Sequence, residues 1–334
     1  MIIHSEFKPA WWLTNAHGQT LYRTLTHRMN AFVDSYERLE LPDGDFIDLA
    51  WKVNGLNEDA PLIILLHGLG GNENSAYVST LFNAFNQSGY RAVLMNFRGA
   101  SGEPNRLPRF YHGGDTADLA FLLQVIKRRE PTTKKGVVGI SLGGNVLLKW
   151  LGETGAQSLI DVAVAVSVPF QSQNVVERIN KGFSRVYQNH LLKKLRRVFL
   201  QKLDVVNDQL PLSQQKLYSI KTLYEFDEQI TAPLHGFASA SDYYLKSSSR
   251  QYLSQIKTPT LIIHALDDPF MTSDILPTSK ELSSDILLEL SQHGGHVGFI
   301  GERGQHWLEQ RIPNFLMDYF PHPSYLREFE KINS

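Results

Sequence analysis

Cysteine is absent from the 334-residue sequence. Its absence excludes a disulfide scaffold, thiolate zinc sites, iron–sulfur clusters and a cysteine nucleophile. Long hydrophobic runs are also missing, since no apolar stretch approaches the roughly 20 residues that a membrane-spanning helix needs. The first residues lack the basic and apolar regions of a signal peptide, so a cytoplasmic protein is expected.

An excess of positive charge is missing too. The 33 Lys and Arg residues are balanced by 34 Asp and Glu residues, which gives a formal net charge of −1. We therefore expect no nucleic-acid partner, because such proteins usually carry a basic surface. Hydrophobic residues make up 42% of the chain and charged residues 20%, a composition typical of a globular protein with a substantial core.

What the chain does contain is an alternation of short apolar runs with segments of helical spacing. The apolar runs are rich in β-forming residues and have no polar face, as in strands that are buried on both sides of a sheet. Such alternation predicts an α/β fold with a mostly parallel central sheet and helices on both faces. The predicted buried strands comprise residues 62–66, 91–97, 136–141, 161–168, 258–266 and 285–291.

The domain organisation follows from one interruption of this alternation. Residues 169–257 show several helical patterns and no buried strand, and the chain is longer than the roughly 150 residues of an average domain. We therefore predict a core of residues 36–168 and 258–334, with residues 169–257 inserted as a helical cap. Residues 1–35 are rich in aromatic side chains without a clear period, and we expect them to form an arm packed on the core.

The strongest functional motif is G-x-S-x-G, found here as Gly139-Ile140-Ser141-Leu142-Gly143. It lies between a buried strand and a segment of helical pattern, the setting in which flanking glycines let a serine point outward as a nucleophile. The alternative is a glycine-rich turn with an incidental serine. Candidate partners downstream favour Ser141 as a nucleophile.

A serine nucleophile needs a histidine base and a carboxylate that orients the histidine. In the strand–turn–helix arrangement these partners follow the serine in the order Asp, His. Asp267 and Asp268 both follow a predicted strand, at the edge where α/β sheets bind ligands. Asp268 is the predicted acid because it directly precedes a short turn and an apolar residue, whereas Asp267 is expected to cap the turn.

Two histidines follow the last predicted strand. His296 is the predicted base because it lies between a glycine and the apolar Val297, as expected for a histidine held on a tight loop. His293 is the rival candidate. A metal site at these histidines is not expected, because no carboxylates or further histidines lie near them in the sequence.

The segment His67-Gly68-Leu69-Gly70-Gly71 follows the first buried strand, where this arrangement offers a backbone N–H to a developing oxyanion. The predicted donors are the amides of Leu69 and Leu142. One alternative is a flexible turn between strand and helix. Another is a phosphate-binding G-x-G-x-x-G loop, but the spacing of these glycines does not fit it.

Several segments together resemble the YheT-like branch of the α/β-hydrolases. They are PAWWLTNAHGQTL in the arm, then HGLGGNENSAYV, NFRGASGEPN, YHGGDTADL, GISLGGNVLLKWLGE, EFDEQITAPLHGF, DYY and LDDPF. The resemblance implies the α/β-hydrolase fold, a carboxylic-ester substrate, no cofactor or metal, and a catalytic triad of Ser141, Asp268 and His296. Members of this group that act on acylglycerols or phospholipids imply a lipid ester as substrate. Transfer of the acyl group to an alcohol, or a catalytically silent protein that binds a lipid or partner, are the alternatives.

The cap carries a local excess of positive charge. Residues 178–203 contain no Asp or Glu, and leucine, valine and phenylalanine recur there at helical spacing between the basic residues. One interpretation is a solvated helix whose apolar face covers the active site. The other is weak contact of residues 190–203 with an anionic membrane. The eight basic residues are Arg178, Lys181, Arg185, Lys193, Lys194, Arg196, Arg197 and Lys202.

Overall fold

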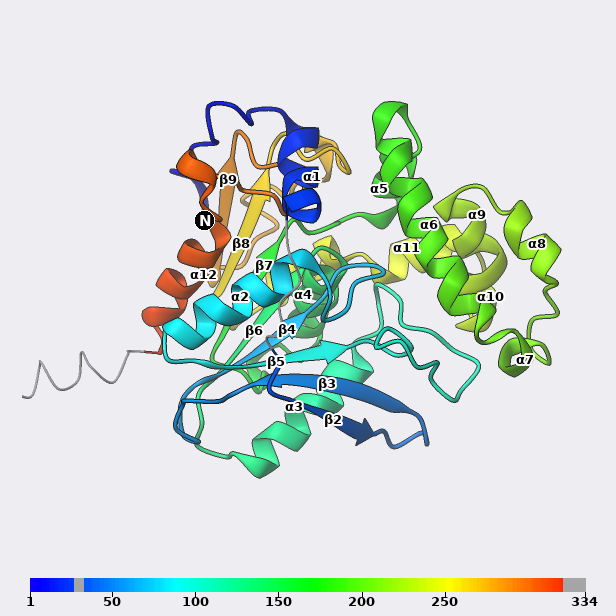
Figure 1. Cartoon of the computed structure of the whole chain (residues 1–334), viewed down its shortest axis with the longest axis horizontal. Helices are drawn as coiled ribbons and strands as arrows, with labels where there is room; N and C mark the ends of the chain where they lie inside the picture. The colour runs from blue at the N-terminus through cyan, green and yellow to red at the C-terminus, as the bar shows by residue number, and fades with distance from the viewer. Residues whose placement is uncertain (27–32, 321–334) are drawn as a thin grey trace, which may run out of the picture.

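The computed structural model describes residues 1–26 and 33–320, and within these ranges the chain forms a nine-stranded sheet (Figure 1). The strand order is β1-β9-β8-β7-β6-β4-β5-β3-β2. Neighbours are parallel from β1 to β5, and β3 and β2 add an antiparallel edge, so the predicted mostly parallel sheet is confirmed. The strands are β1 (Ile2–His4), β2 (Ser35–Glu40), β3 (Phe46–Lys52), β4 (Leu62–Leu66), β5 (Arg91–Asn96), β6 (Lys135–Ile140), β7 (Val162–Val166), β8 (Thr260–Ala265) and β9 (Ile286–Ser291).

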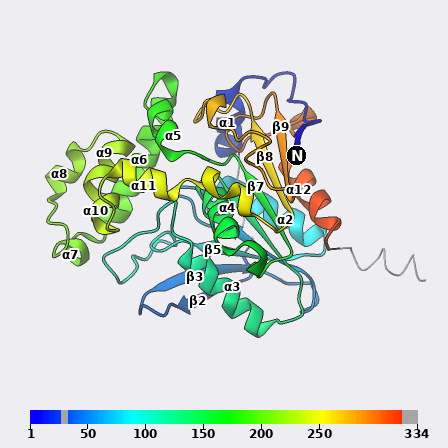
Figure 2. The same cartoon turned by 180° about the vertical axis from the view of Figure 1, so that it is seen from behind.

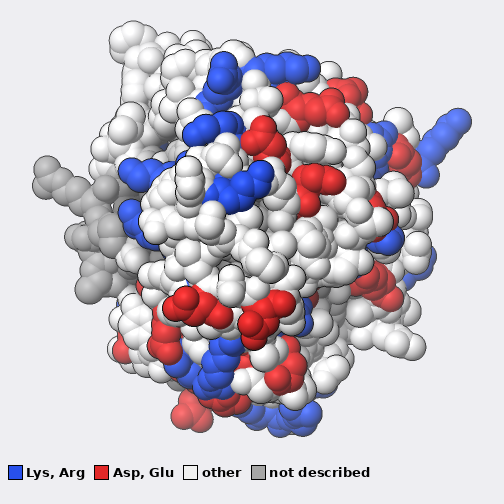
Figure 3. Space-filling view, turned by 90° about the vertical axis from the view of Figure 1, so that its right-hand side faces the viewer, with Lys and Arg blue, Asp and Glu red and all other residues white. Residues whose placement is uncertain are grey.

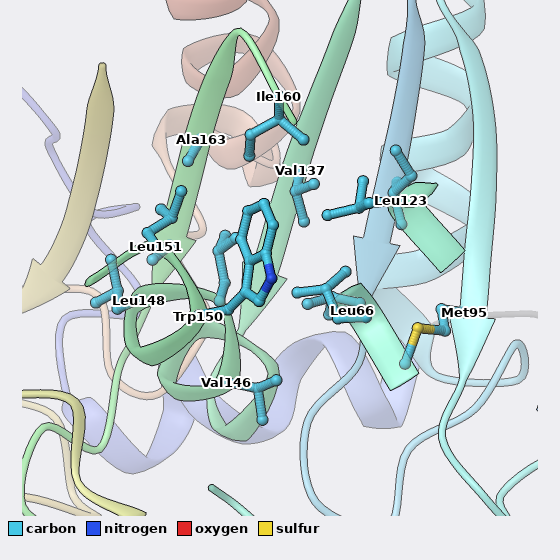
Figure 4. Close-up of a cluster of buried hydrophobic side chains, with 14 of the residues drawn as sticks. Leu66, Met95, Leu123, Val137, Val146, Leu148, Trp150, Leu151, Ile160 and Ala163 are labelled. Atoms are coloured by element: carbon cyan, nitrogen blue, oxygen red, sulfur yellow. The ribbon is translucent and has the colours of Figure 1, made fainter. Parts of the chain in front are cut away.

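Helices cover both faces of the sheet, which explains why its central strands are apolar on both sides. On one face lie α2 (Ala76–Gln87) and α12 (Leu308–Met317), which also contact each other. On the other face lie α3 (Ala117–Arg129) and α4 (Leu142–Thr154) (Figure 2). Figure 4 shows Trp150 of α4 among the apolar side chains that join this helix to the strands.

The N-terminal arm contributes one strand and one helix. β1 pairs in parallel with β9 at the edge of the sheet. Helix α1 (Ala16–Thr26) lies near α2 and packs against the loop that follows β9. This helix is not evident from hydrophobic periodicity, because the residues that it buries are the polar Gln19 and Arg23.

Residues 167–259, all of which the structure describes, contain no strand and form a group of helices beside the sheet (Figure 1). These helices share an apolar cluster of their own. The division into arm, core and cap stays a prediction. None of the helices in the described ranges is long and apolar enough to cross a membrane. The cap helices are α5 (Ser172–Ile179), α6 (Arg185–Leu200), α7 (Leu203–Val206), α8 (Gln214–Ser219), α9 (Leu223–Phe226), α10 (Ala232–Leu234) and α11 (Ala240–Ser247).

Candidate active site

Ser141 lies in the sharp turn between β6 and α4, with φ at 54° and ψ at −116°. A positive φ is uncommon for residues other than glycine and marks backbone strain that the surrounding packing must hold. The positions on both sides of the serine must be glycine, because neighbouring backbone atoms leave no room for a Cβ. A Cβ on Gly139 would lie 2.5 Å from the carbonyl oxygen of Gly143, and a Cβ on Gly143 would lie 2.5 Å from that of Leu66. The glycine spacing of the motif therefore follows from the packing of the turn.

The structure brings the three predicted side chains together. Nε2 of His296 lies 3.0 Å from Oγ of Ser141, and Nδ1 of His296 lies 2.7 Å from Oδ2 of Asp268. Burial alone would raise the pKa of the Asp268 carboxyl, but His296, His264 and the backbone N–H of Phe270 together outweigh burial and hold this pKa below its usual range. Asp268 is therefore ionised at neutral pH and can orient the imidazole and stabilise its protonated form.

An aromatic ring fixes the plane of the imidazole. Phe270 stacks on His296 with the ring centroids 4.0 Å apart and 7° between the planes. The backbone N–H of Phe270 donates to Oδ1 of Asp268 over 2.8 Å. Sequence reasoning gave this side chain no role, and its position two residues after the acid is the signal that could have suggested one.

The rival residues form a separate pair. Oδ1 of Asp267 accepts a hydrogen bond of 2.8 Å from the backbone N–H of Gly295, and its Oδ2 lies 3.4 Å from Nδ1 of His293. Burial raises the pKa of Asp267. Asp267 thus binds the backbone of the histidine loop and not the imidazole of His296. Within the described ranges, no three potential metal-ligating side chains of His, Asp or Glu come together.

The predicted oxyanion loop lies directly against the serine. A Cβ on Gly68 would lie 3.3 Å from the Cβ of Ser141. Two tyrosines that the sequence did not single out as site residues hold this loop: the Tyr77 hydroxyl accepts from the N–H of Gly68, and the Tyr111 hydroxyl accepts from that of Gly70. The amide of Leu69 lies between these two anchored amides. The amide of Leu142 belongs to the first turn of α4, where N–H groups have no partner within the helix.

His67 anchors the same loop from inside the core. Its Nε2 accepts from the backbone N–H of Phe97, so its Nδ1 carries the proton that is donated to the carbonyl of Gly68 over 2.8 Å. Burial lowers the pKa of His67 to about 4, which keeps the ring neutral at physiological pH. His67 therefore has a structural role, because its ring connects the backbone of Gly68 to that of Phe97.

The cap helix α6 contacts the outer side of the oxyanion loop. Nζ of Lys194 donates to the carbonyl of Gly70 over 3.0 Å, and the lysine stem packs on Gly70. Burial, together with the nearby Arg197, lowers the pKa of Lys194. On the same helix the ring of Tyr187 lies 4.8 Å from that of Phe270. The cap thus contacts the surroundings of both the oxyanion loop and the histidine.

Comparison with known proteins places the chain in a family. The α/β hydrolase fold family matches residues 61–302. The YheT protein of Escherichia coli (strain K12) is 43% identical over 319 residues, which cover 94% of each chain. The monoacylglycerol lipase of Saccharomyces cerevisiae is 29% identical, over 91% of this chain and 78% of that protein. Phospholipase ABHD3 of Mus musculus is 28% identical, over 90% and 74% of the two chains.

Solved structures agree with the fold. The esterase Pf2001 of Pyrococcus furiosus superposes with a TM-score of 0.57 at 18% identity, over 88% of this chain and 97% of that one. A superposition of this quality at such low sequence identity shows a common fold and nothing more. Together with the family match and the relatives above, it means that the chain belongs to the α/β-hydrolase family and is a YheT-like hydrolase of its esterase and lipase group.

Proposed function

We propose that this chain is a serine hydrolase that cleaves carboxylic esters of lipids. The observation that carries the proposal is the chain of contacts from Ser141 Oγ to His296 Nε2 at 3.0 Å and from His296 Nδ1 to Asp268 at 2.7 Å. A serine in this arrangement can lose its proton to the imidazole as it attacks a carbonyl carbon. A lipid ester is supported by relatives that are named as a monoacylglycerol lipase and a phospholipase.

The proposed reaction has two halves. His296 takes the proton of Ser141 while the serine oxygen attacks the ester carbonyl, and the N–H groups of Leu69 and Leu142 stabilise the negative charge on the carbonyl oxygen. The imidazolium then gives its proton to the leaving alcohol, which leaves an acyl-enzyme. Water attacks this ester by the same route, with His296 again as the base, and releases the carboxylic acid. Apart from the ester and the water, all groups in this scheme belong to the chain.

A fluorophosphonate probe tests the proposal, because it modifies an activated serine. The folded protein should be labelled at one site, and the modified peptide should contain Ser141. A series of p-nitrophenyl esters of increasing acyl length should then be hydrolysed, and the rates identify the preferred acyl length. A folded protein that resists the probe would be a binding protein, and product formation only with an added alcohol would indicate an acyltransferase.

We also propose weak contact of the cap with an anionic membrane, through the exposed Lys193 and Arg197 of residues 190–203. Four of the eight basic side chains of residues 178–203 donate to acceptors of the protein, and four are exposed. Figure 3, which views the molecule from the side of the cap, shows several Lys and Arg side chains at the surface there. The four that donate hydrogen bonds within the protein are Arg178 to Ser184, Lys194 to Gly70, Arg196 to Ile220, and Lys202 to Asn105, Leu107 and Arg109. The exposed ones are Lys181, Arg185, Lys193 and Arg197.

Vesicle binding tests this contact. Replacement of Lys193 and Arg197 by Gln should weaken binding to vesicles of anionic lipid about thirty-fold at low salt, since each charge near the surface contributes about 1 kcal/mol. Binding of the unmodified protein should disappear at high salt. The control is Lys246→Gln, which removes an exposed cap lysine that is paired with Asp242. If the unmodified protein does not bind anionic vesicles at low salt, α6 has no role in membrane contact.

A further inference from the structure

Helix α1 is bound to the loop that carries His296 by side chains from two successive turns, Gln19 and Thr20 in one and Arg23 in the next. Gln19 is fully buried, and its amide donates to the carbonyl of Ile300 and accepts from the N–H of the same residue. The Thr20 hydroxyl accepts from the backbone N–H of His296 over 2.9 Å. Arg23, also buried, donates to the carbonyl of Gly298.

The loop needs such support because its backbone is strained. Val297 and Phe299 have φ values of 62° and 47°, in the left-handed region that side chains rarely adopt. Conformations of this kind persist only where neighbouring groups hold them. Besides α1, the Ser167 hydroxyl supports the loop by accepting from the N–H of Val297 over 3.1 Å.

The same helix reaches the cap. Nδ1 of His17 lies 2.9 Å from the hydroxyl of Tyr187 in α6, and the Tyr187 ring in turn contacts Phe270, which stacks on the catalytic imidazole. One helix of the arm is therefore in contact with both the base loop and the cap. The family match of residues 61–302 does not include this helix.

We infer that α1 positions the catalytic base, with Thr20 and Gln19 as positioning residues that fix the backbone of His296 and Ile300. The inference rests on the proposed function, in which His296 must stay within hydrogen-bond distance of both Ser141 and Asp268. Without the Thr20 acceptor, the N–H of His296 loses this partner, and the backbone at His296 can shift between the amides of Gly295 and Val297 that stay held. A shift of about 1 Å at a reacting group can lower a rate by about a hundred-fold.

A matched pair of threonines in one helix tests the inference. Thr20 and Thr26 both donate to a carbonyl four residues earlier, but only Thr20 also accepts from the loop. Thr20→Val should lower kcat about ten- to a hundred-fold and slow fluorophosphonate labelling of Ser141 by a similar factor, with KM nearly unchanged. Thr20→Ser should restore both rates. Thr26→Val should leave both within about two-fold of the unmodified protein.

Measurements are made well below the melting temperature of each variant, so that loss of folded protein cannot lower the rates. Should Thr20→Val fail to fold, Thr20→Cys gives a second test, because a thiol is a weaker acceptor and should give an intermediate rate. A Thr20→Val protein that is less stable but has the kcat and labelling rate of the unmodified protein would overturn the inference. That result would leave the proposed function intact, whereas an unmodified protein that resists the probe would overturn the function itself.

Discussion

Replacement of Ser141 by alanine is expected to lower kcat/KM for ester hydrolysis by about 10⁴-fold or more, while the protein stays folded. The substitution removes the attacking oxygen, and the remaining rate would come from the oxyanion loop and substrate binding alone. It keeps a Cβ in the strained turn, where φ is 54°, so the packing around the elbow is unchanged. Hydrolysis of p-nitrophenyl esters and thermal unfolding of the same preparation measure the two outcomes.

Ser284→Ala provides the control, because Ser284 is exposed and its hydroxyl donates to the neighbouring Asp285. It should have the activity of the unmodified protein. A Ser141→Ala protein that retained a tenth of the original activity after exhaustive purification would show that another group performs the attack. The proposed function would then be wrong.

The second large effect is expected for Asp268→Asn, which should lower kcat about 10³- to 10⁴-fold. An amide at this position cannot stabilise the imidazolium, and it favours the imidazole tautomer that cannot accept the serine proton. Asp267→Asn is a matched substitution one residue away, and it should cost less than about ten-fold. Asp267 accepts from the Gly295 N–H, so its replacement affects the loop and leaves the charge beside His296 in place.

The comparison of these two variants decides which carboxylate is the acid. If Asp267→Asn were the more damaging change, the assignment from the structure would be reversed. The pH dependence provides a further check. The pKa of Asp268 lies below its usual range because His296 and other neighbouring groups outweigh the effect of burial, so Asp268 itself should not limit the rate between about pH 5 and 9.

The parts of this molecule that the sequence predicts are those with local signals. Buried strands such as 62–66 and 162–166 are apolar runs with no polar face, and they produce the sheet that the alternation indicated. Ser141 lies in a turn whose glycines are sterically required, so its motif is compact. Asp268 and His296 each follow a strand, and strand ends meet at one edge of a parallel sheet.

The parts that escape prediction depend on long-range polar contacts. Helix α1 buries Gln19 and Arg23, so hydrophobic periodicity cannot reveal the face that it turns to the core. Strand β1 has three residues, which is too few to establish a period of two. The sequence shows where the basic residues of the cap are, but not which of them are exposed. Nothing local distinguishes Lys202, which is buried against backbone carbonyls, from the exposed Lys193.

The contact between Thr20 and His296 joins residues that are 276 positions apart, and this has a consequence for the order in which the enzyme is made. Ser141 precedes His296 by 155 positions, which corresponds to about 8–30 s of translation at roughly 5–20 residues per second. A growing chain therefore carries the proposed nucleophile long before the proposed base exists. Under the proposed function, activity can begin only after the histidine loop has been synthesised and has docked onto α1, so a ribosome-bound chain cannot hydrolyse esters before residue 296 has left the ribosome.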